Sequence, residues 1–120
     1  AGIEQVNQVA KAFTDFYYQA FDQNNRASLR GLYKDISMMT FETSQVQGIE
    51  NIIAKLTSLP FTKIQRKIAT LDAQPSNPTS GTILIMVTGQ LLIDDEKNPQ
   101  HFSQSFQLVP DGPGNYFIFN

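Results

Sequence analysis

The order of the hydrophobic patterns constrains the fold of this chain more than any other feature of its sequence. Apolar residues recur at spacings of three and four from Ile3 to Asp22, which predicts one broad apolar face of an amphipathic helix. Helical spacing does not return after Pro60, and residues 61–120 show strand patterns only. Helices and strands segregated in this way predict an α+β domain, in which helices cover one face of a mainly antiparallel sheet.

Three shorter patterns lie between the first helix and Pro60. Residues 27–35 predict a second, shorter helix, and residues 49–59 repeat the helical spacing until the proline ends it. Residues 36–48 are rich in β-branched and aromatic side chains and end at Gly48, which predicts a strand and a turn. The length of 120 residues fits a single domain.

The later strand patterns differ in how many of their faces are apolar. Residues 61–72 and 101–109 alternate, so we expect each to have one buried and one solvated face. Residues 82–93 follow a loop predicted over residues 73–81 and are apolar on both faces. A last strand pattern begins at Asn115 and meets the end of the chain without a turn or a charge, so we expect this strand to be truncated.

A strand that is apolar on both sides needs cover on both faces of its sheet. The helices can cover only one face, so the other face requires either a pocket or a second copy of the chain. We predict a homodimer that forms through the sheet.

Composition excludes several classes of function. A formal net charge of -2 gives no basic field for a nucleic-acid backbone, so no nucleic-acid partner is expected. The chain has no cysteine, which removes disulfides and thiolate metal sites and fits a reducing compartment. No apolar run is long enough to span a bilayer and no signal-type segment begins the chain, so we expect a soluble, intracellular protein without a membrane partner.

Residues able to carry catalysis or bind a metal are few. His101 is the single histidine and lies on an alternating strand, so we expect no metal site and assign it no catalytic role. One enzymatic hypothesis stays open, in which Tyr17 or Tyr18 supplies a phenol and Asp72 or Asp94 a carboxylate to an apolar pocket. It describes a small-ligand binder or an isomerase- or dehydratase-like enzyme. The alternative is that both tyrosines are ordinary core and rim residues.

Five colinear segments resemble the nuclear transport factor 2 family, most closely its fungal members. They are FTDFYYQAFD (13–22), MMTFETSQVQG (38–48), KLTSLPFTKIQ (55–65), TLDAQP (70–75) and LLIDDEKNPQHFSQSFQLVPDG (91–112). The resemblance spans nearly all of the single domain 1–120. It implies a cone-like α+β fold, in which a bent, mainly antiparallel sheet packs on a long N-terminal helix and two shorter helices.

The resemblance implies a function that needs neither enzymatic activity nor a cofactor. Members of this family are homodimers that carry the GTPase Ran, in its GDP form, into the nucleus and bind Phe-x-Phe-Gly repeats of nucleoporins. A protein of this kind is expected in the cytoplasm, in the nucleus and at the nuclear pore. The family also implies a further acid and a further aromatic residue beyond Asn120, which complete the last strand.

The Ran site of the family is an apolar cavity ringed by acids. The positions that match its acidic rim are Glu42, Asp94 and Glu96. The positions that match its apolar wall are Phe41, Leu59, Ile64 and Phe102. The resemblance implies that the cavity accepts an aromatic side chain of Ran and that the acids orient the partner.

The nucleoporin site of the family lies near the start of the first helix. Val6 stands where animal members have a tryptophan, and this chain has no tryptophan. We therefore expect Ile3 and Phe16 to contribute to the same contact.

The three acids at residues 94–96 allow two interpretations. Side chains alternate along an extended chain, so Asp94 and Glu96 would point to the cavity rim and Asp95 to the other side. A run of charges more commonly forms a solvated turn. The family resemblance favours the extended interpretation.

Overall fold

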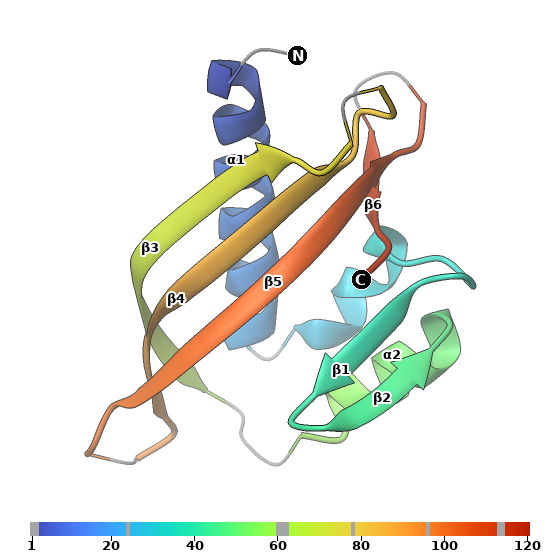
Figure 1. The fold of residues 1–120 in the computed structure, drawn as a ribbon. Helices are drawn as coiled ribbons and strands as arrows, with labels where there is room; N and C mark the ends of the chain where they lie inside the picture. The colour runs from blue at the N-terminus through green and yellow to red at the C-terminus, as the bar shows by residue number, and fades with distance from the viewer. Residues whose placement is uncertain (1–2, 24, 60–62, 78, 96, 113–114) are drawn as a thin grey trace.

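A long helix and a curved sheet make up most of the molecule (Figure 1). The computed structural model describes residues 3–23, 25–59, 63–77, 79–95, 97–112 and 115–120. Its elements in chain order are α1 (Ile3–Asp22), the 3-10 helix η1 (Arg26–Leu32), β1 (Met38–Phe41), β2 (Ser44–Gln47), α2 (Ile49–Thr57), β3 (Ile64–Pro75), β4 (Ile83–Ile93), β5 (Gln100–Pro110) and β6 (Tyr116–Ile118).

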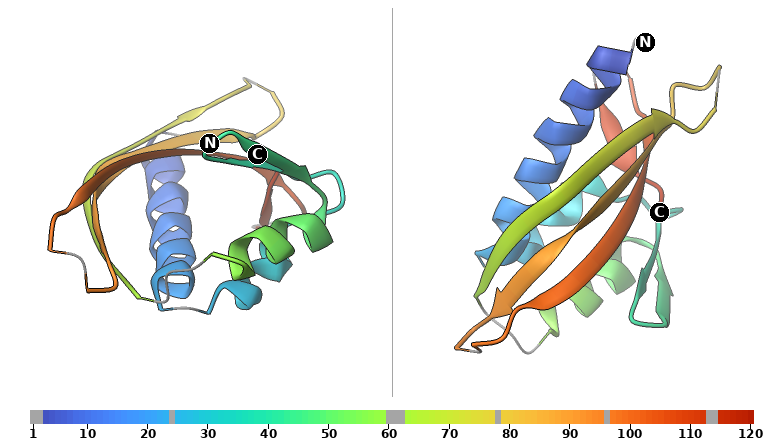
Figure 2. Two further views of the ribbon diagram at one scale, coloured as in Figure 1. Left: turned by 90° about the horizontal axis from the view of Figure 1, so that it is seen from below. Right: turned by 60° about the vertical axis from the view of Figure 1, so that its left-hand side comes forward.

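The strands form a four-stranded sheet and a separate hairpin. The sheet has the order β3-β4-β5-β6, each neighbouring pair is antiparallel, and β1 pairs with β2. The sheet curls around α1, while α2 and η1 lie on the open side of the curl (Figure 2). The predicted α+β class is confirmed, as is the cone-like arrangement of three helices on a bent antiparallel sheet.

The sheet bends where β3 and β4 lose their regular register. The pairing shifts between Ile68 and Thr70, which marks a β-bulge. Gly89 lies opposite this bulge, and a Cβ atom there would overlap the carbonyl oxygen of Lys67 and lie 3.0 Å from the ring of Phe102. Bulges increase local twist, and glycine allows two backbones to approach closely. The bulge and the glycine together account for the bend.

The core lies on the concave side of the sheet. The buried face of α1 packs against inward side chains of β4 and β5. The ring of Phe106 lies 5.0 Å from that of Phe13 and 4.9 Å from that of Tyr17, and both pairs are edge-to-face. Aromatic pairs of this kind contribute about 0.5–1.5 kcal/mol beyond the area they bury. The amphipathic helix predicted from Ile3 to Asp22 has these bounds in the structure.

Three buried tyrosines satisfy their hydroxyl groups inside this core. The hydroxyls of Tyr17 and Tyr33 share a hydrogen bond of 2.9 Å, and the Tyr18 hydroxyl donates to Oε1 of Gln104 at 2.7 Å. Burial raises the pKa of Tyr17, Tyr18 and Tyr33 above the ordinary 10.0, because a buried phenolate loses its hydration. At physiological pH all three are protonated, hydrogen-bonding core residues.

Two element boundaries differ from the predictions. The second helix is a 3-10 helix over Arg26–Leu32, whose polar first half offers too few apolar positions for a longer α-helical face. The loop predicted from residue 73 begins later, because β3 continues to Pro75. Pro75 is tolerated there since β3 is an edge strand, where a missing N–H group removes no hydrogen bond to a second neighbour.

The segment predicted as one strand and a turn is a tight hairpin. Residues 36–48 contain β1 and β2, which pair from Met38 with Gln47 to Phe41 with Ser44. Its two central residues are neither glycine nor asparagine, so turn chemistry gave no signal for a hairpin.

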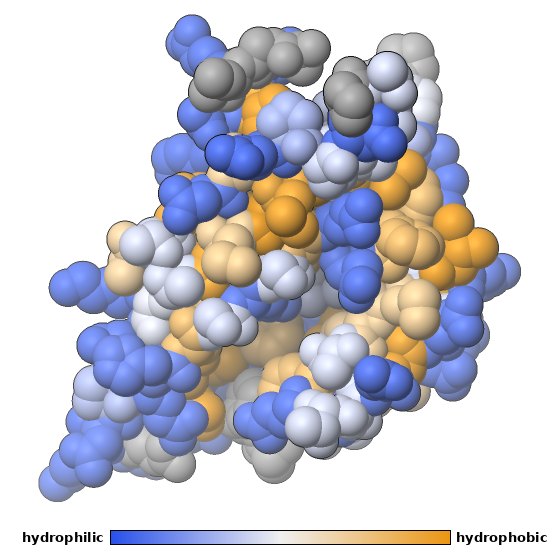
Figure 3. Space-filling model, viewed as in Figure 1, coloured by the Kyte–Doolittle hydropathy of each residue, from blue (hydrophilic) through white to orange (hydrophobic). Residues whose placement is uncertain are grey.

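Among the residues that the structure describes, no helix lies on the convex face of the sheet. Leu84 and Met86 project from β4 on this face and are 47% and 52% exposed, whereas Ile83, Ile85 and Val87 alternate with them and are buried. Apolar atoms gather in the middle of the face (Figure 3). Both faces of β4 are therefore apolar, as predicted, and what covers the convex face stays a prediction.

The bend makes Gly89→Ala a test of the sheet geometry. We expect this change to lower the free energy of unfolding by about 2–3 kcal/mol, since the added methyl group must displace the backbone of β3. Gly31→Ala is the matched control, because a Cβ atom at Gly31 meets no atom within 4 Å. We expect Gly31→Ala to be neutral or to stabilise by roughly 0.5 kcal/mol. Equal urea midpoints for the two variants would contradict this account of the bend.

The buried phenols predict a loss of stability at alkaline pH. Each native pKa is raised, so the unfolded chain loses these protons first, near its ordinary pKa of 10.0. The stabilisation is complete below pH 10 and decreases as the pH rises further, by up to about 1.4 kcal/mol per pH unit for each phenol. Urea unfolding at pH 8, 10 and 11 measures this effect, and Tyr33→Phe should reduce its slope. Phenolate absorption from all three tyrosines at pH 10 in the folded protein would contradict it.

Candidate functional site

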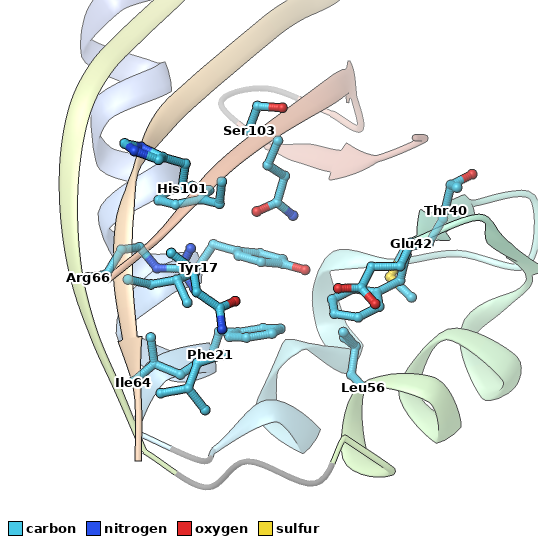
Figure 4. Close-up of a pocket in the computed structure, with 16 residues that line it drawn as sticks. Tyr17, Phe21, Thr40, Glu42, Leu56, Ile64, Arg66, His101 and Ser103 are labelled. Atoms are coloured by element: carbon cyan, nitrogen blue, oxygen red, sulfur yellow. The ribbon is translucent and has the colours of Figure 1, made fainter. Parts of the chain in front are cut away.

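A cavity of about 310 Å³ opens between the sheet, α1 and the β1-β2 hairpin. Figure 4 shows Tyr17 and Phe21 entering it from α1, Ile64 and Arg66 from β3, and Leu56 from α2. The other lining residues come from the hairpin and from the neighbouring ends of β4 and β5: Met39, Thr40, Phe41, Glu42, Leu91, Ile93, Gln100, His101, Phe102, Ser103 and Gln104. Most of this wall is apolar, so the cavity is suited to an apolar or aromatic group.

Glu42 places a carboxylate at the mouth of this cavity. It lies on the turn between β1 and β2, and its side chain points toward the cavity in Figure 4. Glu42 and Thr43 have φ values of 48° and 74°, which is the left-handed region that a two-residue hairpin turn requires. A β-branched residue such as Thr43 is rarely found there, and each such residue costs about 1–3 kcal/mol. The turn therefore holds Glu42 in place at a cost in stability.

The acids after β4 do not follow the extended interpretation. The strand ends at Ile93 and the chain turns at Asp94, whose φ is 50°. Asp94 joins the start of β3: its Oδ1 accepts a hydrogen bond of 2.9 Å from the N–H group of Lys63, and its own N–H donates to the Lys63 carbonyl at 2.8 Å. Asp94 is not among the residues that line the cavity. The predicted alternation of Asp94 and Asp95 is wrong because this turn closes the strand ends, and Glu96 lies outside the described residues.

The predicted apolar wall is present in part. Phe41, Ile64 and Phe102 line the cavity, so the fold brings together three positions that are far apart in the sequence. Leu59 does not line it; this residue is half-buried and packs against the core. Contact of any of these residues with a partner stays a prediction.

Sequence reasoning missed Arg66. Its side chain is 7% exposed, lines the cavity and forms an ion pair with Asp22, in which Nη2 and Oδ1 lie 2.7 Å apart. A signal was available, since alternation along residues 61–72 places position 66 on the same inward face as Ile64. A charged residue on an inward face indicates a buried ion pair.

The residues of the enzymatic hypothesis do not converge. Tyr17 lines the cavity, but neither Asp72 nor Asp94 does, and the hydroxyls of Tyr17 and Tyr18 are hydrogen-bonded to Tyr33 and Gln104. His101 borders the cavity, but its ring is directed away from the side chains of Tyr17 and Glu42 in Figure 4. Groups of acids and histidines able to hold a metal ion are absent from the described residues.

The residues expected at the nucleoporin site are not equivalent in the structure. Val6 is 3% exposed and lines a second cavity of about 280 Å³, between the start of α1 and the β3-β4 connection. Phe16 is 53% exposed on α1 and lines neither cavity. The structure does not describe the side chain of Ile3.

None of the helices in the described residues is both long enough and apolar enough to cross a membrane.

Comparison with known proteins identifies relatives over almost the whole chain. The nuclear transport factor 2 of Emericella nidulans is 59% identical over 112 residues, which cover 93% of this chain and 88% of the relative. That of Saccharomyces cerevisiae is 56% identical over 114 residues, which cover 95% of this chain and 89% of the relative.

A solved structure and a family description agree with these relatives. The structure of nuclear transport factor 2 from Cryptosporidium parvum matches with a TM-score of 0.87 at 45% identity, and the match covers 97% of this chain and 90% of that one. The nuclear transport factor 2 domain matches residues 9–120. With this fold and these relatives, the chain belongs to the nuclear transport factor 2 family.

Proposed function

We propose that this protein is a non-enzymatic nuclear import carrier that binds Ran in its GDP form and Phe-x-Phe-Gly repeats of nucleoporins. The observation that carries the proposal is the apolar cavity with the carboxylate of Glu42 at its mouth. Such a site fits an aromatic side chain that has a basic neighbour. Relatives named nuclear transport factor 2 support a role in nuclear transport. The proposed carrier moves between the cytoplasm and the nucleus through the nuclear pore.

The cavity and its rim contribute differently to binding. Burying one phenylalanine side chain contributes roughly 1.5–3 kcal/mol, whereas an exposed ion pair contributes roughly 0.2–1 kcal/mol. The apolar wall therefore supplies most of the affinity, and Glu42 supplies orientation and the choice of partner. Asp94 and Glu96 stay in the proposal as a second group of acids on the family resemblance alone, since Asp94 does not line the cavity and its Oδ1 accepts a hydrogen bond from the Lys63 N–H group.

The proposed carrier is a homodimer that forms through the convex face of the sheet. Leu84 and Met86 expose apolar surface in the middle of that face, and the same patch on two copies would be self-complementary. A second copy would bury residues that a single chain leaves in water, which favours association.

The proposed nucleoporin contact is the second cavity, beside the start of α1. Its apolar wall includes Val9, Pro75, Ile83 and Tyr116 as well as Val6. These residues surround a hollow that can receive a phenylalanine ring, and Phe16 adds exposed apolar surface on the same helix. In this proposal several smaller apolar side chains take the place of the tryptophan that animal members of the family have at the position of Val6.

Calorimetric titration tests the Ran proposal. We expect the protein to bind Ran loaded with GDP and not Ran loaded with a GTP analogue, and the affinity to fall as salt screens the rim charges. Glu42→Lys should weaken binding at least about tenfold, since it replaces an attraction at the cavity mouth by a repulsion.

Asp95→Lys is the matched control for Glu42→Lys. It changes an exposed acid in the turn after β4 by the same charge, and Asp95 does not line the cavity. We expect Asp95→Lys to bind Ran-GDP within about threefold of the parent protein. Equal losses for the two variants would show a general charge effect and would contradict a specific role for Glu42. If the parent binds neither form of Ran but a small ligand saturates the cavity, the carrier proposal fails.

The dimer proposal predicts that Met86→Lys dissociates the protein. The side chain is exposed in a single chain, so the change should leave the fold intact while placing two charges face to face in the dimer. Sedimentation equilibrium should give the mass of one chain for Met86→Lys. Met38→Lys is the control, because Met38 is 44% exposed on the β1-β2 hairpin, outside the four-stranded sheet that carries Leu84 and Met86. A dimer that survives Met86→Lys would contradict this interface.

A further inference from the structure

Arg66 is a buried cation in the wall of the cavity. Nη2 of Arg66 donates to Oδ1 of Asp22 at 2.7 Å, and Nε donates to Oδ2 at 2.9 Å. The Asp22 side chain is 14% exposed, so both partners are largely removed from water. Two-point contacts between a guanidinium and a carboxylate fix the relative orientation of the two groups. The pair therefore joins the end of α1 to β3 as one rigid unit.

Three aromatic rings surround the same guanidinium. Its central carbon lies 3.9 Å from the ring centre of Tyr18, 4.7 Å from that of Phe102 and 5.6 Å from that of Phe21. The rings of Tyr18 and Phe102 meet edge-to-face at 5.9 Å. A cation within about 6 Å of a ring centre is attracted to it, and more strongly in a desolvated site. Phe102 and Phe21 line the cavity as Arg66 does, so the cation and two of its rings form one part of the wall.

The residue directly opposite Phe102 on β4 supplies no side chain to contact its ring. Phe102 pairs with Gly89 on β4, and the ring lies where a Cβ atom of Gly89 would press on it. Aromatic rings commonly cover strand glycines in this way. Arg66 and Tyr18 contact the ring from other elements, at 4.7 Å and 5.9 Å from its centre.

From this arrangement we infer that Arg66 is a positioning residue of the binding cavity, which holds the Phe102 ring in the wall while Asp22 neutralises its charge. Without Asp22, Arg66 would present an uncompensated positive charge to the cavity and repel a basic partner. The effect on partner binding rests on the proposed function; the coupling between Arg66 and Phe102 does not. Lysine cannot replace arginine here, because an ammonium lacks the planar surface that stacks on rings and the two-point fork that meets Asp22.

A double-mutant cycle tests the inference. The cycle uses the parent protein, Arg66→Lys, Phe102→Leu and the combination, each titrated with Ran-GDP. We expect each single change to weaken binding about five- to tenfold, the range that corresponds to loss of a desolvated cation–ring contact. If Arg66 acts through Phe102, the combination should be no weaker than Phe102→Leu alone. Additive losses would overturn the inference.

The same four proteins give a second cycle in urea, without any partner. We expect the losses of unfolding free energy in the two single variants to sum to more than the loss in the combination. If the parent does not bind Ran-GDP while the urea cycle shows this coupling, the proposed function fails and the positioning role stands. Independent losses in urea would overturn the positioning role whatever the binding result. Phe102→Leu retains the ion pair, so it supplies a folded variant even if Arg66→Lys is unstable.

Arg30→Lys is the matched control for the loss of the guanidinium. Arg30 forms an ion pair with Glu50, but its side chain is 53% exposed and it does not line the cavity. We expect this variant to match the parent in both titrations. A loss equal to that of Arg66→Lys would show that replacing any arginine of this protein has the same effect, and would remove the support for a specific role of Arg66.

Discussion

The bend of the four-stranded sheet is the constraint on which the rest of the molecule depends. A flat antiparallel sheet would expose α1 along both of its sides, whereas the curled sheet arches over the helix and leaves one side open. That open side is covered by α2, η1 and the β1-β2 hairpin, and the cavity is the space that these elements leave unfilled. The bend arises from one bulge and from Gly89, so a small number of backbone contacts determine both the core and the site.

The hydrophobic core and the cavity share residues and are not two separate regions. Tyr17 and Phe21 belong to the buried face of α1 and also line the cavity, while Arg66 and Asp22 connect α1 to the strand at the cavity wall. The helix therefore fixes the shape of the cavity through the same contacts that hold the fold. A rigid cavity loses little conformational entropy when a side chain enters it, which favours binding of one defined partner. This sharing also means that few changes at the site can leave stability untouched.

Burial patterns explain what could be predicted from the sequence. The bounds of α1 and the two apolar faces of β4 follow from spacing alone, because each reflects which side chains leave water. The cavity positions Phe41, Ile64 and Phe102 came from a family resemblance, since an apolar residue in a cavity wall has the same pattern as one in a closed core. The conformation at Asp94 depends on Lys63, which is distant in the sequence, and no local pattern encodes such a contact. Arg66 and Asp22 are 44 positions apart, so alternation could indicate the inward arginine but not its partner.

The strained turn between β1 and β2 has a consequence for how this protein tolerates change. Glu42 and Thr43 occupy backbone conformations that asparagine and glycine adopt at lower cost. Selection for thermal stability of the isolated protein would therefore favour replacement of both residues by asparagine or glycine. The most thermostable variant from such a selection would keep the fold and the cavity but would lose the carboxylate of Glu42 at the mouth of the cavity. Stability and the proposed choice of partner are thus opposed at a single turn, and selection by melting temperature alone would remove the residue that the carrier proposal needs most.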